Sequence, residues 1–521
     1  MRKANGSSKG SISRRTFVGG SAALATMGLP APGARAQTEA PTPKRGGILK
    51  VSAYLNPSKL DPVTGNGGQD QTFLWTMFDT LTDFEPATMK PRPGLAKWSY
   101  PDPKTMVLEL NPNITFHDGT PCDAEAVRWN LDRCMNYKLS AVKPDLASIA
   151  SMETDGPLKV ILHLKNPDTS LPLILSERTG MVSSPKAVQA AGDDYDRKPC
   201  GTGQFKFVSW ADGDRVIVTR NENYWKKDRP YLDGINFRII TDYTAGAHSI
   251  TAGENDLMYL VPPRLFTMMG RDANLKVIKA PSIRTMNLFF NYSRGPLANL
   301  KVRQAINYAI DRVGFTRVTT DGTGEPTGSL ITSQHWAADP NAIKRYPYDP
   351  DKAKALLAEA GYADGMTLEM IFLPDAEYRK RADIMMDNLG KVGIKITPNA
   401  MQQTNQYFNT EKKGDMYLVA WPGKPDMTQT YFLIFAKNSY YNPSGVTVIE
   451  NAEDLINATR TSEDLDTRKA AFAKLIEAER DAASFAPICH EQIVYAMRKK
   501  VKGFEASLLG KPKFDGVWLD T

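Results

Sequence analysis

Between residues 283 and about 420 the sequence alternates between helical and strand patterns, and this alternation constrains the fold most strongly. A helix is predicted from Asp349 as its N-cap to Gly361 as its end, and GIKITPNAM then predicts a strand. Helices that alternate with strands pack on the faces of a sheet, so this region predicts an α/β body with a central sheet. An earlier helix repeats apolar residues at the helical spacing: Val302, Ala305, Ile306, Ala309 and Ile310.

The rest of the chain also mixes predicted strands and helices, and no fixed-period repeat or low-complexity block follows residue 45. TMVLELNPNITF predicts two strands around residues 111–113. TPCDAEAVRWNLDRCMN predicts a helix with Thr120 as N-cap, Pro121 as first residue and Asp123 in the third position. The predicted fold class is therefore α/β throughout the chain.

The N-terminal segment has the features of an export signal. Arg14 and Arg15 precede a short apolar run, and Ala34-Arg35-Ala36 supplies a cleavage motif. The run is too short to span a bilayer, and the paired arginines favour the twin-arginine type over an ordinary secretory signal. No cysteine stands near the cleavage site, so we expect residues 1–36 to be removed and an unanchored protein to reach a Gram-negative periplasm.

The apparent basic charge of the chain belongs to this signal. The signal carries six basic residues and no acidic one, so the formal net charge of +7 falls to +1 in the mature chain. A nearly neutral chain gives no support for nucleic-acid binding, and no later stretch is apolar enough for a membrane helix. Without its first 36 residues the 521-residue chain keeps 485, which predicts about three domains or lobes.

The motifs of the common enzyme classes are missing from the mature sequence. It has no G-x-S-x-G elbow, no H-E-x-x-H and no P-loop. The five histidines do not stand at metal-ligand spacing, and the four cysteines form no C-x-x-C pair. We therefore predict neither an enzyme nor a metal site or cofactor; a periplasmic hydrolase is the enzymatic alternative.

The stretch YLVAWPGKPDMTQTYFLIF, residues 417–435, is unusual in its composition. A predicted strand ends at Trp421, and a turn rich in proline and glycine carries Lys424 and Asp426 before a second aromatic run. Trp421 can stack on a ligand or pack in the core. The two charged residues are candidates for a binding site at the end of the strand.

Eight segments in order resemble the large periplasmic solute-binding proteins of the peptide, nickel and opine type, family 5, which serve ABC importers. The resemblance covers about residues 44–505. The segments are RGGILKVSA, LDPVTG, ITFHDGTPCDAEAVRWNLDR, CGTGQFKFVSW, RNENYWKKDRPYLDGINFRIITD, GENDLM, NLFFNY with KVRQAINYAIDR, and YDPDKAKALLAEAGYADG.

The resemblance implies a two-lobed periplasmic binding protein fold of type II, cluster C-like, with an extra domain inserted in the first lobe. Both crossings between the lobes, near residues 280–287 and 487–494, would be hinges. The four cysteines, Cys122, Cys134, Cys200 and Cys489, allow three full pairings, and the sequence does not choose among them. The two-lobed arrangement implied by the resemblance would let Cys200 and Cys489 approach each other and form a disulfide. The implied boundaries are 37–80, 190–282 and 491–521 for lobe one, 81–189 for the extra domain, and 283–490 for lobe two.

The same resemblance bears on the ligand. In peptide-binding relatives, the position that Lys424 takes here holds an aspartate that pairs with the peptide's α-amine. A cation there should repel an ammonium group and attract an acid. We therefore expect a small organic solute with an acidic group, such as an opine, an amino-acid derivative or an organic acid. If the alignment slips by two residues, Asp426 takes the amine-binding role and a di- or oligopeptide becomes the ligand.

Four further residues are expected at the cleft from their places in the family pattern. Asn66 and Gly67 belong to a glycine-rich loop of lobe one. Arg284 and Asn287 lie where the chain crosses to lobe two, and Arg284 would either hold a carboxylate or bridge the lobes as an ion pair.

The resemblance implies binding by hinge closure and delivery to ABC permease and ATPase subunits by a monomer. The ligand is a small molecule that is not changed chemically. A carrier of nickel or haem, or a component that also serves a chemoreceptor, is the alternative within the same fold.

Overall fold

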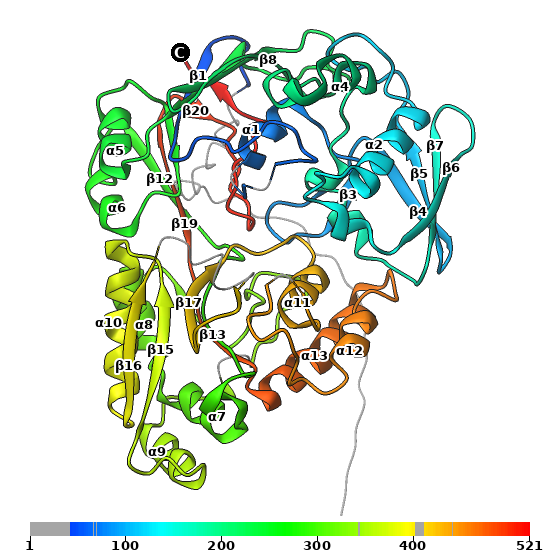
Figure 1. Ribbon diagram of the computed structural model, residues 1–521. Helices are drawn as coiled ribbons and strands as arrows, with labels where there is room; N and C mark the ends of the chain where they lie inside the picture. Colours follow the sequence, from blue (N-terminus) through cyan, green and yellow to red (C-terminus); the bar gives the residue numbers. More distant parts are fainter. Residues whose placement is uncertain (1–41, 66, 69, 342–343, 402–410, 440) are drawn as a thin grey trace, which may run out of the picture. The chain divides into compact units, whose positions relative to one another are not determined.

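The computed structural model describes residues 42–65, 67–68, 70–341, 344–401, 411–439 and 441–521. The predicted export signal and Asn66 lie outside these residues. Residues Pro43–Thr521 form one compact unit, which holds three larger sheets (Figure 1). No helix in the described part of the chain is long and apolar enough to cross a membrane.

The first sheet has seven strands and a core that includes Val51 and Phe237. In spatial order they are β12 (Leu275–Ala280), β19 (Ile493–Arg498), β11 (Leu257–Tyr259), β1 (Ile48–Ala53), β10 (Gly234–Ile239), β9 (Arg215–Arg220) and β8 (Phe205–Ala211). β1 is parallel to both of its neighbours, whereas β19 runs antiparallel between β12 and β11. The helices α1 (Asp70–Met77), α5 (Tyr243–Thr251) and α6 (Pro263–Met269) contact this sheet.

The second sheet has six strands from the later part of the chain. In spatial order they are β14 (Glu325–Pro326), β18 (Phe485–His490), β13 (Thr285–Phe290), β17 (Met416–Trp421), β15 (Met366–Phe372) and β16 (Ile394–Ala400). Its helices are α7 (Leu300–Ala309), α8 (Arg312–Thr319), α9 (Pro350–Glu359), α10 (Ala376–Gly390), α11 (Met427–Phe435), α12 (Ala452–Ala458) and α13 (Leu465–Ala482). The predicted α/β class is confirmed.

Two predicted helices of this region are confirmed in detail. The Asp349 carboxylate accepts a hydrogen bond from the Lys352 amide at 2.9 Å and caps α9. Gly361 follows the helix with a φ of +88°, a conformation that a side chain would strain. The apolar residues predicted for α7 are fully buried, as the helical spacing requires.

A four-stranded antiparallel sheet forms the third body, and two predictions made for this region are wrong. Its strands in spatial order are β4 (Ala96–Asp102), β5 (Thr105–Leu110), β7 (Lys159–Leu164) and β6 (Ile149–Thr154), with α2 (Ala124–Asn136) against them. Asp123, not Thr120, caps α2 and accepts from the Ala126 amide at 3.0 Å. The Thr120 hydroxyl is engaged by Asp118 at 2.6 Å, and the predicted second strand is only an isolated bridge between Thr115 and Pro121.

Short elements complete the chain. The short helices are α3 (Leu171–Ile174) and α4 (Pro185–Ala191), and the 3₁₀ turns are Lys143–Leu146, Arg178–Gly180, Gly192–Arg197 and Gly295–Ala298. Two small sheets pair β2 (Thr82–Phe84) with β3 (Pro91–Pro93) and β20 (Val501–Lys502) with β21 (Trp518–Leu519).

The chain passes twice between the first and second sheets, from β12 to β13 and from β18 to β19. The two crossings lie against each other, because the Glu491 amide donates to the Arg284 carbonyl at 2.9 Å. The Ser282 hydroxyl also donates to the Glu491 carbonyl. The crossings therefore bring one arginine and one glutamate to the junction of the two sheets.

The expected disulfide between Cys200 and Cys489 is wrong. All four cysteines are free and buried. Cys200 packs in the core of the four-stranded sheet, whereas Cys489 packs in the core of the second sheet. The two thiols therefore belong to different hydrophobic cores.

Candidate ligand-binding site

A cavity of about 470 Å³ lies beside the two crossings, and we call it the crossing cavity. Its volume falls in the range of pockets that hold small organic ligands. Its walls come from both sheets and their helices, so a bound molecule would contact both. The side chains that give it chemical character are Tyr54, Tyr243, Arg264, Arg284, Asp375, Glu377, Tyr378, Arg381 and Glu491.

Two arginines converge on one carboxylate in this cavity. Arg284 Nε lies 2.6 Å from one Glu491 oxygen, and Arg381 Nη2 lies 2.7 Å from the other. Burial alone would raise the pKa of Glu491, but Arg381 and Arg284 outweigh it and hold this pKa below its usual range. Glu491 is therefore ionised, and the three groups together carry one positive charge.

The group formed by Arg284, Arg381 and Glu491 can still donate a hydrogen bond to a ligand. Arg381 Nε is buried and has no hydrogen-bond partner among the described residues. A guanidinium group offers donors in a planar fork that matches a carboxylate or phosphate. An acidic group in the crossing cavity could therefore share Arg381 with Glu491.

Aromatic rings form another part of the wall. Tyr54 stacks on Tyr243 with ring centroids 5.6 Å apart, and the Arg381 guanidinium lies 5.1 Å from the Tyr378 ring centre. Burial keeps the pKa of Tyr54 well above its usual value, so its hydroxyl stays neutral. Neutral aromatic surface beside a guanidinium suits an organic molecule that carries an acidic group.

Arg284 is thus the predicted site residue that lies in the crossing cavity, where it forms an ion pair between the crossings. Asn287 is buried in β13, and its side-chain amide donates to the Thr285 carbonyl at 2.9 Å. Gly67 stands at the start of α1, where its amide donates to Asp70 at 3.1 Å. Asn66 lies outside the described residues. The described members of this set do not gather around one cavity.

Lys424 has a partner that the sequence did not predict. Its Nζ lies 3.1 Å from Glu177, which follows α3 in the chain. Glu177 also accepts from the Gln71 side-chain amide at 2.8 Å, and Lys511 Nζ lies 3.9 Å away. We call these four residues, Gln71, Glu177, Lys424 and Lys511, the Glu177 junction.

The electrostatics of the Glu177 junction follow from its burial. Burial alone would raise the pKa of Glu177, but Lys424 and Lys511 outweigh it and hold this pKa at about 2. For Lys424, Glu177 outweighs the lowering effect of burial and raises the pKa. For Lys511, burial and the two neighbouring cations lower the pKa to about 8 despite Glu177.

This pKa gives the stability of the protein a specific pH dependence. The contribution of Glu177 is fully present above its unfolded pKa of 4.5 and is lost as pH falls through about 2. We expect the difference in unfolding free energy between the wild type and Glu177→Gln to shrink as the pH is lowered from about 4.5 to about 2. Urea unfolding of both proteins at a series of pH values measures it. A gap that stays constant from about pH 7 to about pH 2 would contradict the assignment.

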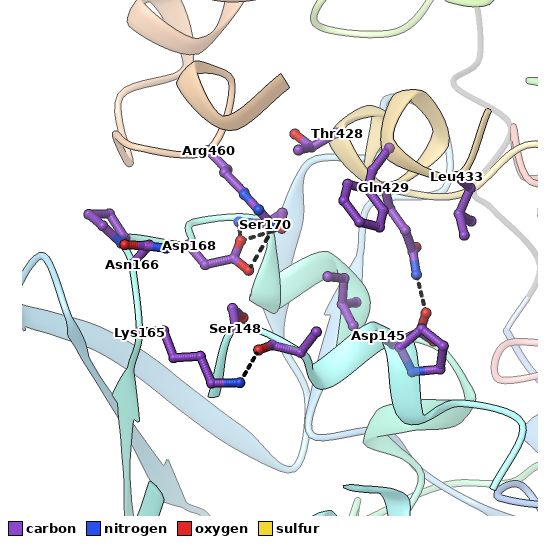
Figure 2. Close-up of a pocket in the computed structure, with 15 residues that line it drawn as sticks. Asp145, Ser148, Lys165, Asn166, Asp168, Ser170, Thr428, Gln429, Leu433 and Arg460 are labelled. Carbon is purple, nitrogen blue, oxygen red and sulfur yellow. Dashed lines mark hydrogen bonds and ion pairs between the residues drawn. The ribbon is translucent and has the colours of Figure 1, made fainter. Parts of the chain in front are cut away.

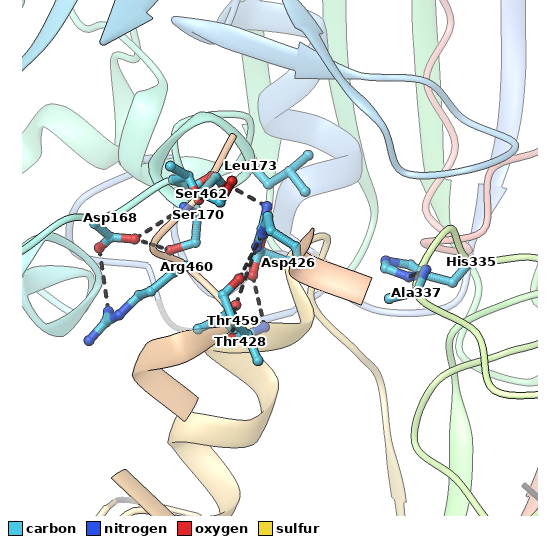
Figure 3. A network of polar contacts seen from close by, with 12 residues as sticks. Asp168, Ser170, Leu173, His335, Ala337, Asp426, Thr428, Thr459, Arg460 and Ser462 are labelled. Atoms are coloured by element: carbon cyan, nitrogen blue, oxygen red, sulfur yellow. Dashed lines mark hydrogen bonds and ion pairs between the residues drawn. The ribbon is translucent and has the colours of Figure 1, made fainter. Parts of the chain in front are cut away.

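Trp421 and Asp426, the other two candidate residues of the 417–435 stretch, are buried in the body built on the second sheet. Trp421 ends β17 and packs edge-on against Tyr441, with ring centroids 4.9 Å apart. Asp426 caps α11 through the Thr428 amide at 2.8 Å, and its other oxygen lies 2.8 Å from Arg468. Figure 3 shows Asp426 within a network of polar contacts that reaches Thr459 and Asp168. Both oxygens of Asp426 are therefore already engaged.

A second cavity, of about 160 Å³, lies between residues 144–174 on one side and α11 with Arg460, which follows α12, on the other (Figure 2). Polar contacts span it: the Gln429 side-chain amide donates to Asp145 at 2.6 Å, and Arg460 lies 3.4 Å from Asp168. The Lys165 ammonium group donates to the Ala147 carbonyl at 2.8 Å within the wall of the cavity. Its charged groups thus have partners within the chain.

A family model for bacterial extracellular solute-binding proteins, family 5, matches residues 90–443, which is more than half of the chain. The chain belongs to this family. Thus the resemblance seen in the sequence is confirmed, and family 5 members are solute-binding proteins rather than enzymes.

Individual relatives agree with this assignment. The family 5 protein is 28% identical over 473 residues to the glutathione-binding protein GsiB of Salmonella paratyphi A, covering 87% of this chain and 91% of that one. Among solved structures, DppA of Helicobacter pylori with the peptide STSA has a TM-score of 0.81 at 22% identity, over 92% of this chain and 99% of that one. AgaA of A. tumefacien R10 with agropinic acid has a TM-score of 0.80 at 22% identity, over 91% and 100%. These likenesses confirm the type II periplasmic binding protein fold.

Sequence reasoning missed four residues that dominate these sites: Glu177, Arg381, Glu491 and Lys511. Arg381 sits within a predicted helix, in a run of charged residues that looks like a solvated face. Glu491 follows a buried strand, and its place at the predicted second crossing could have marked it as a candidate residue of the cleft. No local pattern marks Glu177 or Lys511 as partners of Lys424.

Proposed function

We propose that this family 5 protein is the periplasmic solute-binding component of an ABC importer, and that it closes over its solute by hinge bending. The crossing cavity supports this proposal most directly, because both crossings line it and both sheets contribute walls. The bodies built on the first and second sheets would act as the two lobes, with the four-stranded sheet as the extra domain. The lobe boundaries expected from the sequence remain part of this proposal.

The loaded, closed protein would then dock on a membrane permease, and an ATPase subunit would drive release. Family 5 binding proteins work with such partners. We propose a monomer in the periplasm after removal of the export signal. Ligand contacts made only in the closed form would shift the population toward it.

For the ligand we propose a small organic solute with an acidic group, held in the crossing cavity. The positive charge shared by Arg284, Arg381 and Glu491 supports an anionic group there. The neutral tyrosine walls support an organic body. A contact between Lys424 and the acid, as expected from the sequence, is the alternative to this proposal: Lys424 does not line the crossing cavity, and an acid would have to share it with Glu177.

A peptide is the second candidate, because relatives bind glutathione and the peptide STSA. A peptide also ends in a carboxylate that Arg381 could hold. The candidates differ at the other end of the molecule, where a peptide needs a partner for its amine. Asp426 is engaged by Arg468, so we favour a ligand without a free α-amine.

The variant Arg381→Gln tests the proposed site. It removes the donor to the acid and leaves Glu491 less neutralised, so we expect an acidic ligand to bind about 100-fold more weakly. Isothermal titration would use organic acids, amino-acid derivatives and dipeptides, each against its primary amide. The matched control is Arg379→Gln, because Arg379 is exposed in the same helix and pairs with Asp383. Equal affinity for acids and amides in the wild type would contradict the proposal.

A further inference from the structure

The Glu177 junction connects parts of the chain that are far apart in the sequence. Gln71 lies in α1, Glu177 follows α3, Lys424 lies in the loop between β17 and α11, and Lys511 lies near the C-terminus. Of these, Lys424 alone belongs to the body of the second sheet. One buried carboxylate therefore joins the second sheet to the rest of the molecule.

Glu177 itself is held on the side of the first sheet. The Gly180 carbonyl accepts from the Leu81 amide at 2.9 Å, and Arg178 donates to the Gly65 carbonyl. Met181 packs into the core of the first sheet. A movement of the second sheet would therefore leave Glu177 behind and separate it from Lys424.

The loop that carries Lys424 is fixed on the opposite side. Lys424 lies in the short loop between Trp421, which ends β17, and the start of α11, and both elements belong to the body of the second sheet. Asp426, two residues after Lys424, caps α11 and pairs with Arg468. Because the strand and the helix hold both ends of this loop, Lys424 is presented to Glu177 in a defined position.

The junction is separate from the ligand cavity. None of its four residues lines the crossing cavity. Other contacts continue the same interface: Asp145 accepts from Gln429, and the Thr169 hydroxyl donates to the Ser462 carbonyl at 2.7 Å. These contacts also link residues 144–170 to the body of the second sheet.

We propose that Glu177 is a positioning residue for closure: it captures Lys424 when the two sheets approach, so that Lys424 stabilises the closed form whatever the ligand. The inference rests on the proposed hinge closure. It assigns ligand choice to the arginines of the crossing cavity and closure to the Glu177 junction. Loss of the junction should weaken all ligands by the same factor, because it changes the closing equilibrium and not the ligand contacts.

Spin labels on the mature protein test this proposal without any ligand. Labels are placed through Ser209→Cys in β8 of the first sheet and Lys469→Cys in α13 of the second body; both positions are exposed, and the native cysteines are buried. Double electron–electron resonance then gives the distance between the two bodies. In Glu177→Gln we expect a shift toward longer distances and about tenfold weaker binding of an acid and of its amide alike. Lys424→Met should produce the same shift in distance and the same loss of affinity. The double variant should show no larger effect than either single variant.

The matched control is Asp83→Asn. Asp83 is a partly buried acid paired with Lys513 at 2.6 Å and with Arg92 at 2.7 Å, on the side of the first sheet only. It should leave the distance between the labels unchanged. Unchanged distances in Glu177→Gln and Lys424→Met would overturn the proposal, and so would tighter binding of acids alone. If no solute binds, the importer function fails, whereas the label distances still decide the role of Glu177.

Discussion

Replacing Asp426 with alanine is expected to lower the free energy of unfolding by about 3–5 kcal/mol. Asp426 is fully buried, and its partner Arg468 is only 2% exposed. Without the carboxylate the Arg468 guanidinium would remain buried without its counter-charge, which is the costly outcome for a buried pair. The α11 helix would also lose its N-cap, which contributes about 1 kcal/mol.

Urea unfolding of the mature protein measures this effect, and two further variants separate its parts. Asp426→Asn keeps a side-chain oxygen for the cap and removes the charge, so it reports mainly on the pair. Asp349→Ala removes the cap of α9, where the structure gives the aspartate no cationic partner, and should cost about 1 kcal/mol. A loss in Asp426→Ala no larger than in Asp349→Ala would mean that the buried pair adds little.

Gly203→Ala is expected to destabilise the protein by about 3 kcal/mol or more. A Cβ at this position would collide with the backbone of Met77 and Phe78, at the end of α1. Because backbone atoms cannot rotate aside as a side chain can, the two segments would have to separate. The Gly203 amide, which donates to the Met77 carbonyl at 2.9 Å, would lose its bond.

Gly390→Ala is the matched control. Gly390 ends α10, and nothing lies within 4 Å of the Cβ that alanine would add. Alanine there should leave the stability unchanged or raise it by up to about 1 kcal/mol. Both proteins are compared by thermal and urea unfolding. If the two alanines have the same effect, close packing against α1 is not the reason for the glycine.

The parts of the fold that the sequence predicted well are those fixed by neighbouring residues. The Asp349 cap, the buried face of α7 and the strand after α10 each follow from short-range patterns. The Thr120 cap was predicted wrongly because Thr120 and Asp123 are both residue types that cap helices, and they stand only three positions apart. In the structure the Thr120 hydroxyl donates to Asp118 instead, and Asp123 caps the helix. The tight packing at Gly203 was not predicted either, since it depends on a helix about 125 residues earlier in the chain.

The candidate site was less predictable for a related reason. Charged side chains are common on any surface, and their meaning depends on partners brought together by the fold. Lys424 and Glu177 are 247 residues apart, and Arg284 and Glu491 are 207 apart. The loop sequence identified Lys424 as unusual, but only the packing of the bodies supplies the carboxylate beside it. The pairing of Cys200 with Cys489 was wrong because each thiol faces its own core.

The position of β19 in the first sheet has a consequence for biosynthesis. This strand, residues 493–498, fills the place between β12 and β11, so the sheet stays incomplete until almost the whole chain has left the ribosome. The four-stranded sheet needs only residues 96–164 and can form much earlier. We expect synthesis to yield a nascent chain with one finished domain and an open, unfinished sheet, which would need protection by chaperones until translation ends.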